Sequence, residues 1–163
     1  MRIRLAAAGD AAEFVRLKEL IVTGSYPFDY SPAQLAAWRP RAREAFIDLV
    51  GRDDHVQFVI DRDDGGRLAG CVSAALERVL PSPSWPAVHG YIGDMAVDDD
   101  VRGLGWGTKL LDRAMDWCVA SGAETIRLTA TASAVGFYRA AGFRPEGGHE
   151  AFQHMRWSAP QPD

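Results

Sequence analysis

The sequence predicts a mixed α/β fold, in which one sheet contains both antiparallel and parallel strands. The spacing of apolar residues is helical up to about residue 50 and then changes to alternation, which is typical of strands. The turn signal at 63–66, Asp-Asp-Gly-Gly, joins two of the alternating runs as a hairpin. Later runs at 88–97 and 125–129 each lead into a helical pattern. Strands and helices do not alternate throughout the chain, so a doubly wound parallel sheet is excluded.

The first half of the chain is expected to hold one strand and two or three helices. The strand covers 3–7, and apolar side chains from Phe14 to Ile21 then recur at helical spacing. Ser31 and Gln34, on either side of a proline at the first helical position, have the pattern of a capping box. Pro40 follows about two turns later and predicts a break or kink. A further helix then runs up to Gly51.

The second half is expected to supply most of the sheet. Three prolines between 80 and 87 predict a loop, and the apolar positions 107, 110, 111, 114, 115 and 118 form one helical stripe. The predicted elements are strands over 56–60, 68–77 and 88–97, a helix over 105–121, a strand over 125–129, a helix over 133–141 and late strand material at Phe143 and over 152–157.

Composition is ordinary for a globular protein. The 163 residues are 47% hydrophobic and 25% charged, and the formal net charge is −4. A disordered or fibrous chain is excluded by these values. An acidic balance also argues against nucleic acid as a partner, since such binders usually carry a basic patch. The length predicts a single domain over 1–163.

The cysteines and the N-terminus indicate a reducing, cytoplasmic compartment. Cys71 and Cys118 lack the spacing of a zinc site and are expected to be buried thiols. The N-terminal apolar run has only four residues, far fewer than a signal peptide requires. No stretch approaches the roughly 18 apolar residues of a membrane span, so no membrane partner is expected.

The most informative segment is the glycine-rich loop at 102–107, Arg-Gly-Leu-Gly-Trp-Gly, between a strand and a helix. Glycines let the backbone turn tightly and approach a ligand closely. Successive amides at a helix N-terminus form a cradle for an anion, which Arg102 would reinforce. The segment therefore predicts a site for a phosphate or pyrophosphate.

Two other phosphate loops fit poorly. A nucleotide-hydrolase loop requires Gly-Lys-Ser/Thr, but here Lys109 follows Thr108. A dinucleotide fingerprint requires the spacing G-x-G-x-x-G and an acidic residue about 20 positions on, where this chain has 129–131, Thr-Ala-Thr. A glycine-rich turn that caps a helix without any ligand stays open as an alternative.

Two motifs together resemble a known family. The loop at 102–107 resembles the Arg/Gln-x-x-Gly-x-Gly/Ala acetyl-coenzyme A loop of the GNAT superfamily of N-acetyltransferases. Thirty residues on, the segment 131–143 resembles that family's Asn-x-x-Ala-x-x-Phe-Tyr-x-x-x-Gly-Phe block, with Ala134, Phe137, Tyr138 and Gly142 in place. Thr131 stands where the family often has Asn.

The resemblance implies a GNAT fold and an enzyme. The fold would be a strongly twisted mixed sheet of six to seven strands, with helices on both faces and a splayed strand pair that forms the coenzyme A cleft. The activity would be transfer of acetyl from acetyl-CoA to a primary amine of a small molecule or peptide by direct attack. The alternative is a CoA-binding regulatory module without catalysis, and an unliganded structural domain is a further rival.

The resemblance also assigns cofactor-binding residues. Backbone amides of the strand before the loop would contact the acetyl carbonyl and the pantetheine arm. The residues assigned to the cofactor are Met95, Ala96, Val97, Arg102, Gly103, Leu104, Gly105, Trp106, Gly107, Thr108, Thr131, Phe137 and Tyr138. No metal is expected, because the four histidines have no i, i+4 pairing and no nearby cysteine.

Acyl transfer also requires an acid for the departing thiolate and a base for the amine. The resemblance places Tyr138 near the cofactor sulfur, and a phenol with a pKa of about 10 is protonated at pH 7. Many relatives carry a glutamate near position 93, which is glycine here. Asp94 is its neighbour, and Glu77 and His89 at adjacent strand ends are candidates that would act through water.

The acceptor pocket is assigned to the aromatic segment between the first helices. In relatives this region lines the pocket, and here it contains Tyr26, Phe28 and Tyr30. With Asp29 among them, the rings would suit a cation or a small amine. Ordinary core packing or packing in a homodimer is the open alternative for these side chains.

Overall fold

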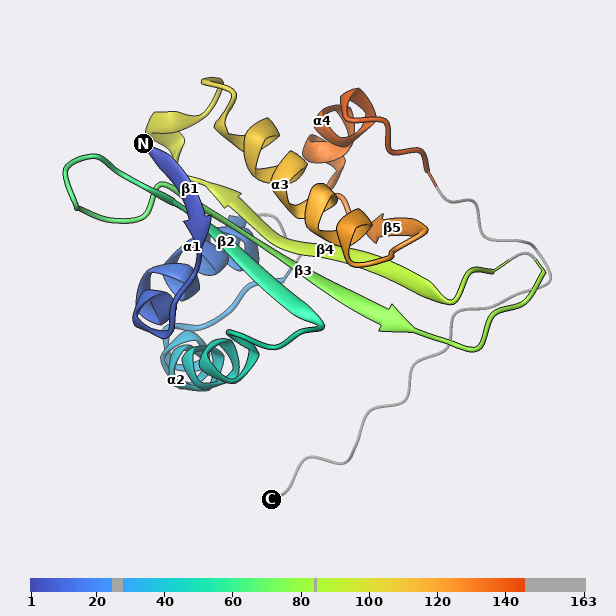
Figure 1. The fold of residues 1–163 in the computed structure, drawn as a ribbon. Coiled ribbons are helices and arrows are strands. Elements are labelled where there is room, and N and C mark those ends of the chain that lie inside the picture. The colour runs from blue at the N-terminus through green and yellow to red at the C-terminus, as the bar shows by residue number, and fades with distance from the viewer. Residues whose placement is uncertain (25–27, 84, 146–163) are drawn as a thin grey trace, which may run out of the picture.

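The computed structural model describes residues 1–24, 28–83 and 85–145. Its path is drawn in Figure 1. The elements in chain order are β1 (Arg2–Leu5), α1 (Ala11–Gly24), α2 (Pro32–Leu49), β2 (His55–Asp61), β3 (Gly70–Arg78), β4 (Val88–Val97), α3 (Trp106–Ala120), β5 (Thr125–Leu128) and α4 (Val135–Ala140), with short 3-10 turns η1 (Ala8–Asp10), η2 (Asp99–Val101) and η3 (Ala132–Ala134).

The sheet is mixed, as the sequence predicts. Its strands lie in the order β1-β2-β3-β4-β5. The first four pair antiparallel with their neighbours, whereas β4 and β5 are parallel because α3 forms the crossover between them. The described residues form five strands, so the prediction of six to seven is wrong for this part of the chain. The late strand material predicted over 152–157 lies outside the described residues. Phe143, also predicted to be in a strand, follows α4 outside any strand, because its N–H donates to Tyr138 O at the end of that helix.

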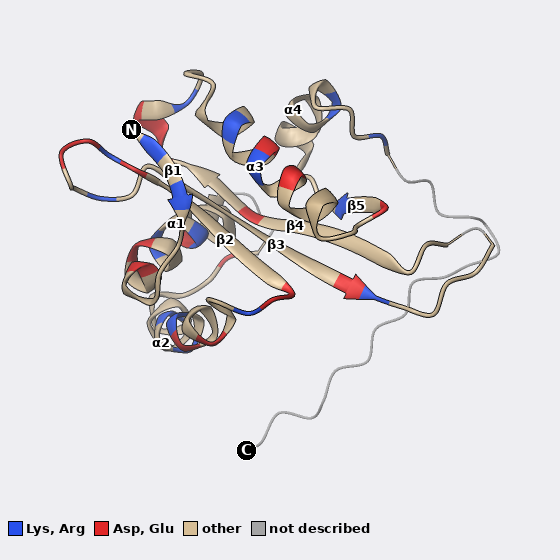
Figure 2. Cartoon of the chain, viewed as in Figure 1, with Lys and Arg blue, Asp and Glu red and all other residues tan. Residues whose placement is uncertain are grey.

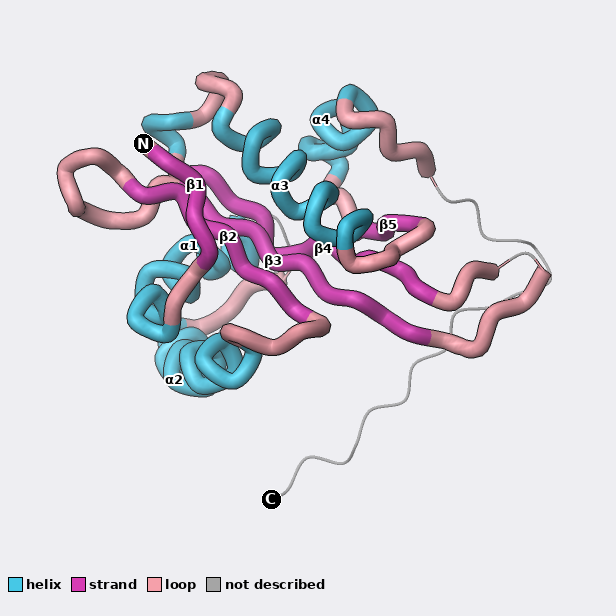
Figure 3. The backbone as a smooth tube through the Cα atoms, in the orientation of Figure 1, coloured by secondary structure: helices cyan, strands magenta, loops and turns pink. Residues whose placement is uncertain are grey.

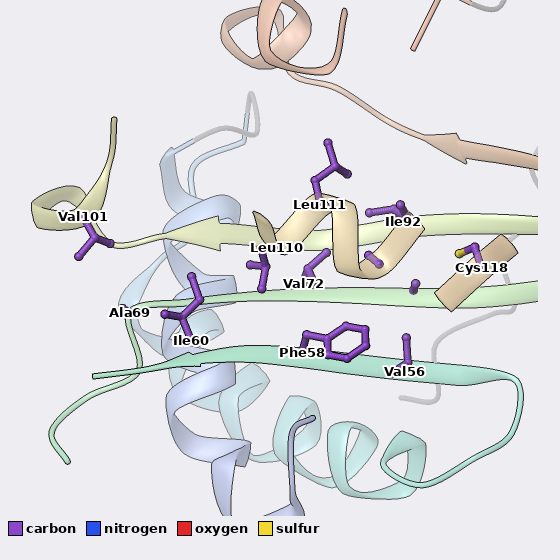
Figure 4. Packing of buried hydrophobic residues seen from close by; sticks show 12 residues of the cluster. Val56, Phe58, Ile60, Ala69, Val72, Ile92, Val101, Leu110, Leu111 and Cys118 are labelled. Carbon is purple, nitrogen blue, oxygen red and sulfur yellow. The ribbon is translucent and has the colours of Figure 1, made fainter. Parts of the chain in front are cut away.

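Helices cover both faces of the sheet (Figures 1 and 3). The apolar stripe of α3 is buried against one face, which confirms the helical spacing predicted from the sequence. Every second residue of β2 points to this face, as alternation along a strand requires. Figure 4 shows the resulting cluster, which includes Val56, Phe58, Ile60, Val72, Ile92, Leu110, Leu111 and Cys118.

A second core lies on the opposite face, beneath α1 and α2. Phe14 of α1 packs on Phe46 of α2 with ring centroids 4.7 Å apart, and both contact a cluster that contains Leu17, Val59 and Cys71. Alternate residues of β2 and β3 therefore supply the two cores. This second packing fixes α1 against the sheet beside β4.

The helix α2 runs without a break through Pro40, where the sequence predicts a break or kink between two helices. Ser31 and Gln34 form the predicted capping box, in which Gln34 N donates to Ser31 Oγ and Ser31 N donates to Gln34 Oε1. Proline removes only one backbone hydrogen bond. Contacts to α1 hold the helix on both sides of it, through Arg39 to Glu19 and through Phe46.

Both cysteines are buried free thiols, as expected. Burial raises the pKa of Cys118 to about 11 and raises the pKa of Cys71 further. Both side chains therefore stay protonated and unreactive near neutral pH.

Candidate active site

A β-bulge in β4 defines the centre of the site. Cys71 pairs with Ala96 and Ser73 pairs with Gly93, so Asp94 and Met95 together oppose the single residue Val72. Asp94 takes the extra position with φ +51°, the one positive φ of a non-glycine residue in the described ranges. A bulge leaves backbone groups of the longer strand without ladder partners and bends that strand. Free main-chain donors are therefore placed at this point of β4.

Past the bulge, the outer edge of β4 is open. The last pair between β4 and β5 joins Ile92 to Leu128, and β5 ends there. β4 continues to Val97, so the segment from Gly93 to Val97 has no β5 partner among the described residues. The predicted cofactor-contact residues Met95, Ala96 and Val97 lie on this open edge. β4 therefore extends past the end of β5, and its backbone at this edge is available to a ligand.

The glycine-rich loop follows η2 and forms the start of α3. Gly103 has φ +74° and Gly105, the N-cap, has φ +79°. An ideal Cβ at either position meets no atom within 4 Å, so the space in front of the loop is open in the described structure. Since the first amides of a helix have no intrahelical acceptor, those of α3 face outward for an anion.

Three arginines hold the segment around this loop. Arg16 of α1 donates to both carboxylate oxygens of Asp98, at 2.9 and 3.2 Å, and to Leu68 O. Arg62 donates to Asp98 and binds Asp100 through two nitrogens. Arg102 lies 2.7 Å from Asp99 and is exposed. The acidic run at 98–100 is thus neutralised by cations, and the sequence analysis missed the roles of Arg16 and Arg62.

Tyr138 brings the second motif to the open edge of β4. Its hydroxyl donates to Met95 Sδ at 3.7 Å, and its ring packs on Phe137 and Phe143. Burial raises the pKa of the Tyr138 phenol, and the phenol of Tyr91 raises it further. The neutral, proton-donating form of Tyr138 is therefore favoured at pH 7.

The remaining cofactor candidates surround this point. Met95 Cε and the Phe137 ring lie 3.7 and 3.8 Å from an ideal Cβ at Gly107, so the strand, α3 and α4 converge here. Thr131 precedes η3, and its Oγ1 lies 3.2 Å from Ser133 Oγ. Leu104 is exposed, as is Thr108, while Trp106 is partly buried.

Each candidate carboxylate forms an ion pair with a basic side chain. Asp94 Oδ1 lies 2.7 Å from Lys18 Nζ, and its Oδ2 accepts from Ser73 Oγ at 2.9 Å. Glu77 Oε2 accepts from Arg127 Nη2 at 2.6 Å. Asp94 stands at the bulge, whereas Glu77 pairs in register with His89, five residues before Asp94. That separation is roughly 16 Å along β4.

The aromatic ring of Tyr91 lies over Gly93. An ideal Cβ at Gly93 would lie 3.2 Å from Tyr91 Cε1 and 3.7 Å from Ser73 Oγ. The half-exposed Tyr91 side chain therefore covers the glycine next to the bulge. Sequence analysis missed Tyr91, although the alternation of residues 88–97 places it on the same strand face as Gly93.

The predicted acceptor segment follows α1, the helix that contacts the bulge of β4. Lys18 contacts Asp94, and α1 ends at Gly24, about 9 Å further along the helix axis. Phe28 is exposed and packs edge to face with Tyr30, with ring centroids 6.5 Å apart. Tyr26 lies outside the described residues.

A family comparison confirms the resemblance that the two motifs indicate. The model of the acetyltransferase (GNAT) family matches residues 23–143, which is most of the chain and includes both motifs. The chain belongs to the GNAT acetyltransferase family. The glycine-rich loop, the open edge of β4 and Tyr138 all lie within the matched range.

Solved structures share the GNAT fold over nearly the whole chain. A GCN5-related N-acetyltransferase from Ralstonia eutropha has a TM-score of 0.76 and 21% identity, covering 91% of this chain and 95% of that one. A predicted acetyltransferase from Clostridium acetobutylicum, crystallised with acetyl-CoA, has a TM-score of 0.74 and 18% identity, covering 95% of each. At these identities the likeness concerns the fold.

One curated relative is closer in sequence over a shorter stretch. Glucosamine 6-phosphate N-acetyltransferase from Arabidopsis thaliana is 31% identical over 90 residues, which cover 55% of this chain. The match spans 59% of that relative's length. A crystal structure of glucosamine-6-phosphate N-acetyltransferase from the same organism has a TM-score of 0.66 and 22% identity, covering 96% of this chain and 97% of that one.

The residues fit the acetyl-CoA that GNAT enzymes use. The open space before Gly103 and Gly105 and the outward amides of α3 suit a pyrophosphate, with Arg102 at the rim. The open edge of β4 suits an extended arm that forms backbone hydrogen bonds. In the described ranges, no group of three His, Cys, Asp or Glu side chains is placed to hold a metal ion. Within the same ranges, no helix has the length and apolarity to cross a membrane.

Proposed function

We propose that the protein transfers the acetyl group of acetyl-CoA to a primary amine of a small molecule or peptide by direct attack. The observation that carries this proposal is the contact between Tyr138 and Met95. It places a protonated phenol at the open edge of β4, beside a bulge with free main-chain donors. This adjacency supports Tyr138 as the proposed acid and the main chain of β4 as the proposed oxyanion donor, the two groups that thioester aminolysis requires.

The chemistry follows from this arrangement. The neutral amine nitrogen attacks the thioester carbonyl carbon, and the carbonyl oxygen becomes an oxyanion. Main-chain N–H groups of the segment Met95 to Val97 are the proposed donors to that oxygen. As the tetrahedral centre collapses, the carbon–sulfur bond breaks and Tyr138 gives its proton to the departing thiolate. The amide product and free CoA then leave.

The proton of the attacking amine needs an acceptor. We assign it to Asp94 through water, because Asp94 stands at the bulge while Glu77 lies far along the strand. Lys18 and Ser73 fix the orientation of the Asp94 carboxylate. Glu77 is the second candidate, and His89 is a third, since it shares the row of Glu77 on the sheet.

The cofactor would bind along the loop and the open edge. Arg102 and the backbone of Gly103, Leu104 and Gly105 would hold the pyrophosphate, with the first turn of α3 at Trp106, Gly107 and Thr108. Positioning by such a cradle supplies much of the rate of acyl transfer. Thr131 and Phe137 would border the pantetheine arm of the cofactor, and Tyr138 would lie beside the cofactor sulfur.

The acceptor is proposed to enter from the side of the segment that contains Phe28 and Tyr30. Glucosamine 6-phosphate is one acceptor to test, because a curated relative carries that name. We also propose a cytoplasmic location and leave the homodimer as a hypothesis that sedimentation would test.

The test is release of free CoA thiol from acetyl-CoA over a panel of amines. The panel contains glucosamine 6-phosphate, a diamine, a neutral alkylamine and a peptide with a free N-terminus. We expect amine-dependent thiol release with at least one member, accompanied by the N-acetylated product in a mass spectrum. Binding of acetyl-CoA without release over a broad panel would contradict the proposal.

That second outcome would favour a CoA-binding regulatory module. One observation supports this rival: both candidate carboxylates are already paired with cations, Asp94 with Lys18 and Glu77 with Arg127. Calorimetry with acetyl-CoA, run beside the thiol assay, separates a binding module from a protein that binds no cofactor.

A further inference from the structure

Four side chains form a cluster on the face of the sheet that carries Lys18 and Asp94. We call it the Arg127 cluster. It consists of Glu77 at the end of β3, Trp85 before β4, His89 on β4 and Arg127 on β5. The Trp85 ring lies 4.7 Å from the His89 ring and 5.2 Å from Arg127 Cζ, measured to its centroid. Figure 2 shows the acidic and basic segments of β3 and β5 on either side of β4.

The Arg127 side chain is held in place, but most of its N–H donors have no partner among the described residues. Its Nη2 donates to Glu77 Oε2 at 2.6 Å, and Trp85 stacks near its guanidinium. The side chain is 35% exposed, and the described residues use one of its five N–H donors. A guanidinium that is held in place with free donors suits bidentate binding of a carboxylate or phosphate.

The cluster also contains buried polar atoms that lack a hydrogen-bond partner in the described structure. Two side-chain atoms there are buried without a hydrogen-bond partner, Arg127 Nε and His89 Nε2. His89 is 1% exposed, and its Nδ1 lies 2.7 Å from Thr125 Oγ1. Both unpartnered atoms are nitrogens, and buried polar atoms in native structures normally have partners. An oxygen atom of a ligand would satisfy the N–H of Arg127 Nε, while His89 Nε2 donates or accepts according to the tautomer of the ring.

The cluster lies within reach of the reaction centre. Arg127 pairs in register with Tyr91, whose ring covers Gly93 beside the bulge. Asp94 lies three positions after Tyr91, a distance of about 10 Å along a strand. A molecule lying across the Tyr91 ring would therefore reach both the bulge and Arg127.

We propose that Arg127 binds an anionic group of the acceptor, a carboxylate or a phosphate, about 10 Å from the amine that is acetylated. Tyr91 is the platform between the two ends, Trp85 packs against the Arg127 guanidinium, and His89 packs on Trp85. Glu77 occupies one edge of the guanidinium and is largely exposed, so it limits the affinity for the anion. This inference rests on the proposed acetyltransferase activity.

The experiment compares matched acceptors. The first pair, 6-aminohexanoate and 6-aminohexanamide, tests a carboxylate. The second pair, 6-aminohexyl phosphate and 6-aminohexanol, tests a phosphate, so the two arms of the experiment are separate. The measured quantity is the ratio of kcat/KM for the anionic member to kcat/KM for the neutral member. We expect a ratio above about tenfold for wild type in at least one arm, and a ratio near one for Arg127→Gln.

Two variants sharpen the result. Glu77→Gln removes the competing carboxylate, so the ratio should rise above the wild-type value. Arg78→Gln removes an exposed positive charge at the next position of β3 and should leave the ratio unchanged. Thermal unfolding of Arg127→Gln checks that the variant is folded. A ratio near one in both arms for an active wild-type enzyme would overturn the inference and leave the acetyltransferase proposal standing.

A second readout does not depend on activity. The chain has five tryptophans, so its indole N–H signals are few, and Trp85→Phe assigns the signal of Trp85 in an NMR spectrum. Titration with inorganic phosphate should shift that signal in wild type and not in Arg127→Gln. If no amine is acetylated but this shift is present, the anion site stands without the proposed function. If the shift is absent and the ratio is one, a bound water explains the two unpartnered nitrogens.

Discussion

Lys18 Nζ lies 2.7 Å from Asp94 Oδ1, which joins α1 to the bulge of β4. The other oxygen of the same carboxylate accepts from Ser73 Oγ on β3. Asp94 therefore has fixed contacts to two neighbouring elements while its backbone holds a positive φ. Because a bulge interrupts the hydrogen-bonded ladder of a strand, this ion pair couples the orientation of α1 to the geometry of the proposed reaction centre.

The first prediction concerns the base. Asp94→Asn keeps a residue type that tolerates the left-handed region, so the bulge is preserved while the charge is lost. If Asp94 accepts the amine's proton, kcat/KM at pH 7 for a neutral amine should fall by about 10²–10⁴-fold. Glu77→Gln is the matched variant and should stay within about twofold of wild type with the same amine. Unchanged kcat/KM in both variants would exclude both carboxylates.

The second prediction concerns the acid. Tyr138→Phe retains the ring and removes the proton donor, so kcat should drop by about 10²–10⁴-fold while acetyl-CoA still binds. If Tyr138 is the acid, activity requires the protonated phenol, and burial raises the pKa of Tyr138 above its ordinary value. Activity should therefore persist through neutral pH and decline only as pH rises through that raised pKa.

The pH dependence supplies the control for Tyr138. Tyr138→Phe should lack the alkaline decline, whereas Tyr91→Phe should retain it. Turnover of Tyr138→Phe within about twofold of wild type would contradict an acid role and leave the side chain with a packing role only.

The third prediction concerns the glycine-rich loop. Gly105→Val places a β-branched side chain at φ +79°, in front of the first amides of α3. The affinity for acetyl-CoA should fall at least tenfold, measured by calorimetry. Gly122→Val imposes a similar strain at φ +92° beyond the other end of α3 and should leave the affinity unchanged. Unaltered binding by a folded Gly105→Val would show that the loop does not hold the cofactor.

The fourth prediction concerns the ion pairs beside the glycine-rich loop. Arg16→Met removes the donors to Asp98, Glu13 and Leu68 O, and leaves a mostly buried carboxylate short of partners. The free energy of unfolding in urea should fall by about 2–4 kcal/mol. Arg52→Met breaks an exposed pair with Asp54 and should hardly change the urea midpoint. Equal midpoints for the two variants would contradict the anchoring role.

Much of the fold was predictable because local signals agreed with tertiary packing. The capping box of Ser31 and Gln34 starts α2 where the sequence places it, and the apolar stripe of α3 is the buried face. Pro40 is the exception, because contacts of α2 with α1 keep the helix continuous in spite of the lost hydrogen bond.

The site was predictable only in part. The glycine-rich loop and Tyr138 carry local motifs, so their assignment did not need coordinates. Lys18, Tyr91 and Arg127 have no motif, and their placement depends on which strands and helices become neighbours. Asp94 was named as a candidate, but its ion pair joins residues 76 positions apart and could not be read from spacing.

The sequence by itself determined the mixed α/β class, the order of most elements and the family motifs, because periodicity, capping and glycine placement act over a few residues. The tertiary structure decided the bulge at Asp94, the open edge of β4 and the contact of Tyr138 with Met95. It also decided that the carboxylates of Asp94 and Glu77 lie beside cations. These features arise from strand register and helix packing, which depend on contacts between residues far apart in the chain.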